Sequence, residues 1–213
     1  MAQRGSYAKG VAKREEILER ALEVIAREGY RGASVKEIAD AVGLSQAGLL
    51  HYFDSKEELF TEILRKRDEV DMVHYAPLSP EEEERADLRH GYLDVIRHNR
   101  DVPGLVQLFS RLSVDAADPQ HPAHRYFIER NDTLRAVFAR ALAQRQAAGE
   151  LSDRVDAETL ARIFQAVADG MQIQWMLDPD VDMAATVDAL FDALTTPKAL
   201  TTPKKDSTHD AAS

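Results

Sequence analysis

The chain has no cysteine among its 213 residues, which excludes disulfide bonds, thiol nucleophiles and thiolate metal sites. No apolar run approaches the roughly 20 residues that a membrane-spanning helix needs, and the first residues lack the apolar core of a secretion signal. No alternation of apolar and polar residues indicates a β-strand. We therefore expect an all-helical, cytoplasmic protein of one or two domains.

The motifs of common enzyme sites are also missing. The sequence has no glycine-rich phosphate loop, no G-x-S-x-G elbow and no H-E-x-x-H motif. His121 and His124 have a spacing found in metal sites, but Pro122 between them favours a helix start with solvent-facing rings. No cofactor and no metal are expected. A helical-bundle enzyme or small-molecule carrier stays as the alternative function.

The net charge of −10 would by itself disfavour binding to nucleic acid. Its distribution changes that expectation. Residues 1–56 carry 9 basic and 8 acidic side chains, so 18 of the 27 basic and 29 of the 37 acidic side chains lie after them. The acid excess is therefore C-terminal. Residues 1–12 contain basic residues and no acid, and they are predicted to form a flexible arm, either close to phosphate groups or simply solvated.

Residues 34–56, SVKEIADAVGLSQAGLLHYFDSK, have the pattern of two short helices joined by a tight turn. Ser34 and Glu37 have the spacing of a capping box, so the first helix is predicted to begin just after Ser34. Gly43 can end that helix in a left-handed conformation. Ser45 can cap the second helix. The outward face of this second helix carries small and hydrogen-bonding residues, which fits the major groove of DNA.

The longer segment 13–67 resembles the DNA-binding region of the tetracycline-repressor (TetR) family of bacterial regulators. The shared order of features is an amphipathic helix, Gly29 with an aromatic residue, the two-helix motif, and S-K-E-E-L at the start of a further helix. The resemblance implies a three-helix DNA-binding domain over residues 13–70. It also implies a homodimer that binds a palindromic operator in double-stranded DNA.

The second helix of the motif departs from the family pattern. Where the family commonly has Thr-Leu-Tyr, this chain has Gly48-Leu49-Leu50, so two hydroxyl groups that would contact phosphate are missing. Gln46 can pair with adenine and Ala47 with a thymine methyl, and Leu50 either meets a methyl or packs. The residues that the resemblance assigns to DNA binding are Ser34, Ser45, Gln46, Ala47, His51, Tyr52 and Lys56.

Five further helices are predicted beyond a boundary near residues 71–80. Proline, glycine and aspartate separate them, and Asp156 and Asp182 are good N-caps. Residues 71–196 are predicted to form a helical bundle for effector binding and dimerisation, and residues 197–213 a disordered tail. The predicted helices are 80–99, 103–117, 121–148, 156–177 and 183–195.

The predicted helix 156–177 has an apolar arc wider than one helix face, so it needs two packing partners, and the final helix adds further apolar residues. Pairing with the same helices of a second chain would form a four-helix interface. The residues predicted for this dimer interface are Phe164, Val187, Leu190, Phe191 and Leu194.

Aromatic and methionine side chains elsewhere in the bundle are either plain core or the lining of a small-molecule pocket. The resemblance implies the second use, in a repressor that an unknown effector releases from its operator. Activation of transcription stays open. The residues predicted for the pocket are Tyr92, Ile96, Leu108, Phe109, Leu112, Phe127, Phe138, Met171, Gln172 and Trp175.

Overall fold

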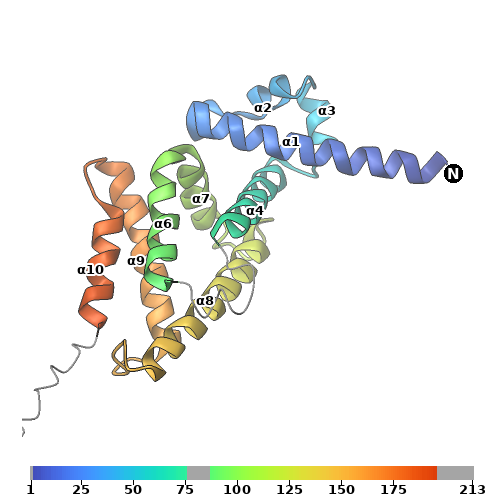
Figure 1. Ribbon diagram of the computed structural model, residues 1–213. Coiled ribbons are helices and arrows are strands. Elements are labelled where there is room, and N and C mark those ends of the chain that lie inside the picture. The colour runs from blue at the N-terminus through green and yellow to red at the C-terminus, as the bar shows by residue number, and fades with distance from the viewer. Residues whose placement is uncertain (1, 76–86, 196–213) are drawn as a thin grey trace, which may run out of the picture.

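The computed structural model describes residues 2–75 and 87–195, and its regular elements are helices (Figure 1). Within these ranges, no helix combines the length and the apolar composition that crossing a lipid bilayer requires. The predicted all-helical class is confirmed. In chain order the elements are α1 (Ala2–Gly32), α2 (Val35–Ala41), α3 (Gln46–Leu50), α4 (Lys56–Tyr75), α6 (Leu88–His98), the 3-10 helix η1 (Asn99–Asp101), α7 (Pro103–Asp115), α8 (His124–Ala147), α9 (Ala157–Leu177) and α10 (Met183–Leu194).

The helix ends follow the predicted capping residues. The Ser34 hydroxyl accepts a hydrogen bond from the Glu37 N–H (3.4 Å), and the Glu37 carboxylate accepts one from the Ser34 N–H (3.1 Å). This capping box starts α2. Gly43 has a φ of 68° and ends the turn after α2, as predicted. Asp156 and Asp182 cap α9 and α10 through their carboxylates.

The start of α1 differs from the prediction. The helix begins at Ala2, so residues 2–12 are helical where a flexible arm was predicted. These residues contain no proline and continue directly into an amphipathic helix, so the helix propagates through them without a new nucleation step. Helical geometry is interrupted at Gly29 (φ 72°, ψ 166°), which is the predicted end of this helix.

The domain boundary was predicted near residues 71–80, and α4 ends within this range, at Tyr75. The predicted helix start at Ser79-Pro80 and the predicted tail 197–213 lie outside the described residues. In the described part, α6 starts after Asp87, whose carboxylate accepts the N–H groups of Arg89 and His90.

Two apolar cores hold the helices together. The first core contains residues of α1, α2, α3, α4, α7 and the beginning of α8. The DNA-binding segment is therefore not packed on its own. Leu49 and Phe53 are buried in it beside Ile38, as the helical spacing predicted. The second core joins α6, α8, α9 and α10. In Figure 1, α9 and α10 lie side by side at the outer edge of the C-terminal part.

Helices α1 and α7 make backbone contact at a pair of glycines. A Cβ atom on Gly104 would lie 2.2 Å from the carbonyl oxygen of Ile25 and 2.8 Å from the Cα of Gly29. Backbone atoms cannot move aside as the end of a side chain can, so only glycine fits at Gly104. This Gly29–Gly104 contact attaches α1 to the C-terminal helices independently of α4.

Candidate nucleic-acid interface and effector pocket

Helices α2 and α3 lie on the side of α1 that faces away from the C-terminal helices (Figure 1). The Ser45 hydroxyl accepts a hydrogen bond from the Gly48 N–H (3.0 Å) and starts α3. Gln46, Ala47 and His51 are exposed, as base contacts require. We refer to α1–α3 as the DNA-binding head.

The other residues predicted for DNA binding lie around this exposed group. Ser34 and Lys56 are exposed, and Lys56 is the first residue of α4. Tyr52 is half-buried against the first core. Its ring and that of His51 are in an edge-to-face arrangement, with centroids 6.1 Å apart. Leu50 also packs against this core, which favours the packing role that the sequence left open.

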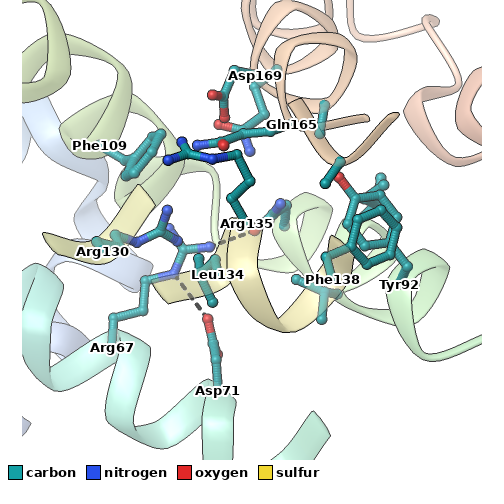
Figure 2. Close-up of a pocket in the computed structure, with 16 residues that line it drawn as sticks. Arg67, Asp71, Tyr92, Phe109, Arg130, Leu134, Arg135, Phe138, Gln165 and Asp169 are labelled. Carbon is teal, nitrogen blue, oxygen red and sulfur yellow. Dashed lines mark hydrogen bonds and ion pairs between the residues drawn. The ribbon is translucent and has the colours of Figure 1, made fainter. Parts of the chain in front are cut away.

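A pocket of about 140 Å³ lies where α4, α6, α7, α8 and α9 meet (Figure 2). Figure 2 shows Tyr92 and Phe138 on one side of it, with Arg67, Asp71 and Arg130 on the other. The apolar part of its lining comprises Tyr92, Val95, Ile96, Phe109, Leu134, Phe138, Ala161 and Ala168. The polar part comprises Arg67, Asp71, Asn99, Arg130, Arg135, Gln165, Asp169 and Gln172.

Half of the residues predicted for an effector site line this pocket. They are Tyr92, Ile96, Phe109, Phe138 and Gln172.

The other five residues do not line this pocket. Leu108, Leu112 and Phe127 are buried in the first core, and Met171 and Trp175 in the second. Helical spacing shows that such a side chain points inward, but it does not show whether a cavity or another side chain lies opposite.

The pocket also contains charged groups that were not predicted from the sequence. The Arg130 Nε donates hydrogen bonds to both carboxylate oxygens of Asp68, at 2.9 and 3.0 Å. The Arg130 guanidinium also lies over the Phe109 ring, 4.8 Å from its centroid. Burial is the largest influence and lowers the pKa of Arg130, but Asp68, Tyr126 and Asp169 together outweigh it, so the pKa is raised. The Tyr126 hydroxyl donates a hydrogen bond to the same carboxylate (2.6 Å).

Arg67 lies on α4 and joins that helix to η1. It donates a short hydrogen bond to the side-chain oxygen of Asn99. Its Nε lies 3.4 Å from the carboxylate of Asp71, which makes an ion pair, yet this Nε makes no hydrogen bond with the described residues. Burial lowers the pKa of Arg67 and raises that of Asp71.

Two acceptors on α9 lack partners. The side-chain oxygen of Gln172 is buried and has no hydrogen-bond partner among the described residues. Asp169, one helical turn earlier, makes no hydrogen bond or ion pair of 4 Å or less with them. Burial raises the pKa of Asp169, and the charge of Arg130 opposes this only in part. The Gln172 oxygen is thus a buried acceptor without a hydrogen bond, which is costly to the free protein, and Asp169 is half-buried beside it. Such groups are typical of a binding site.

Replacement of Asp169 by asparagine is expected to stabilise the free protein at neutral pH. Because the folded state raises the pKa of Asp169, it binds this proton more tightly than the unfolded state, and the carboxyl costs more stability as pH rises above its ordinary pKa of about 3.9. Asparagine removes that cost. We expect a gain in Tm of about 2 °C or more at pH 7.5.

The gain should shrink toward zero near pH 4, and thermal unfolding across this pH range measures it. Asp153→Asn is the matched control, because Asp153 is exposed between α8 and α9. A pH-independent gain, or a loss at pH 7.5, would contradict the assignment of an unpaired carboxylate.

The residues predicted for the dimer interface fall into a buried group and a half-buried group. Phe164, Val187 and Phe191 are buried inside the protomer, in the second core, and present almost no surface to a partner. The Phe164 ring lies 4.4 Å from that of Phe191 and 5.3 Å from that of Phe138, measured between centroids. These large side chains fill the second core of a single chain. Leu190 and Leu194 are half-buried against the same core.

A different set of apolar residues on α9 is exposed. Ile163 is 38% exposed, Ile173 51% and Leu177 82%. Ala166 and Gly170 lie between them at intervals of three and four residues, which places all five on one helix face. We refer to these five residues as the α9 stripe.

The histidines that suggested a metal site face the backbone. His124 Nδ1 lies 2.8 Å from the Ala116 carbonyl oxygen, and His121 Nδ1 accepts a hydrogen bond from the Ala123 N–H (3.1 Å). In residues 2–75 and 87–195, no group of three or more His, Asp or Glu side chains has the arrangement of a metal site.

These features define a helix-turn-helix transcription regulator with a helical C-terminal domain. Residues 17–63 match the sequence profile of the bacterial regulatory proteins of the tetR family. Residues 113–196 match the C-terminal profile of BetI-type transcriptional repressors. The chain belongs to the TetR family.

Its relatives agree with this assignment. The HTH-type transcriptional repressor AcnR of Corynebacterium diphtheriae is 28% identical over 160 residues, which cover 74% of this chain and 78% of AcnR. The HTH-type transcriptional regulator RutR of Escherichia coli is 34% identical over 101 residues, or 46% of each chain. The chain is thus a DNA-binding transcription regulator.

A solved structure supports the fold. A TetR transcription regulator from Haloarcula marismortui has a TM-score of 0.69 and 21% identity, with 87% of this chain and 100% of that chain covered.

Proposed function

We propose that two copies of this chain bind a palindromic operator in bacterial cytoplasm, and that a small molecule in the pocket releases them from DNA. The observation that carries the proposal is the position of α4. Its first residue, Lys56, lies beside the DNA-binding head, and Arg67 and Asp71 further along line the pocket. One rigid helix thus connects the two sites.

The contacts of α4 indicate how a ligand would act. Arg67 binds Asn99 of η1, and Asp68 binds Arg130 and Tyr126 of α8. A ligand that binds the remaining donor groups of Arg67 or Arg130 pulls on side chains that hold these contacts and favours another position of α4. The separation of the two DNA-binding heads then changes, and the affinity for an operator with fixed half-site spacing falls.

The α9 stripe supports the homodimer. Exposed apolar side chains at heptad-like spacing favour a helix partner, and α9 lies beside α10 at the edge of the molecule (Figure 1). Two-fold pairing of α9 and α10 would bury the stripe in a four-helix interface.

The function is tested by gel shift on the DNA upstream of the chain's own gene. Gln46→Ala or His51→Ala is expected to relax sequence preference by about 1–3 kcal/mol for each lost base contact. Lys56→Ala should weaken binding to all sequences alike, because a phosphate contact carries no sequence information. Fluorescence anisotropy on matched and mutated operators measures both effects.

Gln144→Ala is the control for these changes, because Gln144 is exposed on α8. It should leave specific and non-specific DNA affinity unchanged. Equal losses on specific and non-specific DNA for all three variants of the DNA-binding head would show that base and phosphate contacts are wrongly sorted. Absence of any sequence-specific binding would overturn the proposed function.

A further inference from the structure

The charges around the pocket are balanced except at one position. Each arginine that lines the pocket makes an ion pair with an aspartate, whereas Asp169 makes no ion pair and no hydrogen bond with the described residues and feels only the more distant charge of Arg130. A carboxylate in such a place favours a cationic group of a ligand. The arginine pairs are Arg67 with Asp71 (3.4 Å), Arg130 with Asp68 (2.9 Å) and Arg135 with Asp132 (2.5 Å).

The pocket also offers hydrogen-bond donors. The Nε of Arg67 is buried without a hydrogen-bond partner. Arg130 uses its Nε for Asp68, and its two terminal amino groups make no hydrogen bond with the described residues. The guanidinium fork of an arginine matches a carboxylate. A purely cationic ligand would face these two guanidiniums, and a purely anionic one would face Asp169.

The remaining lining limits the size and the body of a ligand. Tyr92 and Phe138 stack on each other with centroids 4.6 Å apart, on the side opposite Arg67 and Arg130 (Figure 2). They provide an apolar surface. A cavity of about 140 Å³ is near the size that holds benzene, so it admits roughly six to eight non-hydrogen atoms. Drug-sized ligands need about 300 Å³ or more.

We propose that the effector of this pocket is a small zwitterion with an apolar body, of the class of the free aliphatic amino acids. Its carboxylate binds Arg67 and Arg130, its ammonium group binds Asp169 and the side-chain oxygen of Gln172, and its side chain contacts Tyr92 and Phe138. This inference rests on the proposed role of the pocket as an effector site. It assigns a ligand group to Asp169 and to the two buried atoms, Arg67 Nε and the Gln172 oxygen, that lack a hydrogen bond.

The test uses the full chain and three zwitterionic probes: glycine, L-alanine and L-valine. Two analogues of valine carry one charge each, namely 3-methylbutanoate, without the amine, and 2-methylpropan-1-amine, without the carboxylate. Thermal shift and titration calorimetry are performed without DNA. At least one zwitterion should raise Tm by about 2 °C or more at saturating concentration, and both single-charge analogues should bind at least about 10-fold more weakly than valine.

Asp169→Asn should weaken zwitterion binding by about 10- to 150-fold, since a charge-assisted contact is lost. Asp153→Asn, exposed and distant in sequence, should bind as the unaltered protein does. The inference is overturned if no zwitterion binds, if either single-charge analogue binds as tightly as valine, or if Asp169→Asn binds normally. A gel shift without ligand is performed in parallel. Loss of operator binding there would refute the proposed function alone, whereas a normal gel shift with no zwitterion binding would refute only the ligand class.

Discussion

Ile173→Glu is expected to convert the protein to a folded monomer that no longer binds its operator. Ile173 belongs to the α9 stripe and is 51% exposed in the single chain, so glutamate is tolerated by the protomer. In the proposed dimer the same charge would be buried in an apolar interface, which costs several kcal/mol. Without the partner, each DNA-binding head binds a half-site alone, and operator affinity should fall by about 100-fold or more.

Sedimentation and circular dichroism measure the two parts of this prediction. The variant should sediment as a monomer with unchanged helix content. Ile128→Glu on α8 is the matched control, because Ile128 is also 51% exposed and lies outside the stripe. It should stay dimeric. A dimeric Ile173→Glu, or an unaltered chain that is monomeric at micromolar concentration, would rule out the α9 stripe as the interface.

Gly104→Ala is expected to lower stability by about 1–3 kcal/mol and to weaken DNA binding as well. The added methyl group would lie 2.2 Å from the carbonyl oxygen of Ile25, so α7 and α1 must move apart. A loss of this size corresponds to about 2–4 °C in Tm for each kcal/mol in a chain of this length. Operator affinity falls because the orientation of α1 changes with the contact.

Gly91→Ala makes the same chemical change in α6, where an added Cβ meets nothing within 4 Å. It should raise Tm slightly, since alanine favours a helix interior by about 0.5–1 kcal/mol over glycine. The two variants are expected to change Tm in opposite directions, which distinguishes the effect of packing from that of helix propensity. If Gly104→Ala were as stable as Gly91→Ala, the close approach of α1 and α7 would be refuted.

The sequence predicts features that depend on neighbouring residues. Ser34, Gly43 and Asp156 act within one helical turn, and the structure places each at the predicted helix end. The start of α1 was not predictable in this way, because no proline precedes Lys13 to stop the helix. Local signals therefore give helix type and many helix ends, but they do not limit a helix that has no breaker.

The pocket and the interface depend on how separate helices meet. Phe164 and Met171 have the spacing of inward residues, and both proved to be solid core. Arg67 and Asp71 have the i, i+4 spacing of an ordinary surface ion pair, so nothing local marks them as pocket residues. Asp169 follows an apolar stretch of α9, but its lack of a partner is visible only after α8 and α9 are packed.

The shared first core limits how this protein can be recombined. Helix α7 and the beginning of α8 pack into the same core as the DNA-binding head, and the Gly29–Gly104 contact fixes the spacing between them. A chimaera that receives a new head by exchange at α4 alone would thus combine two surfaces that never packed against each other. To change operator specificity and keep effector response, the graft must be confined to exposed side chains of α3 or must carry the matching face of α7 with it.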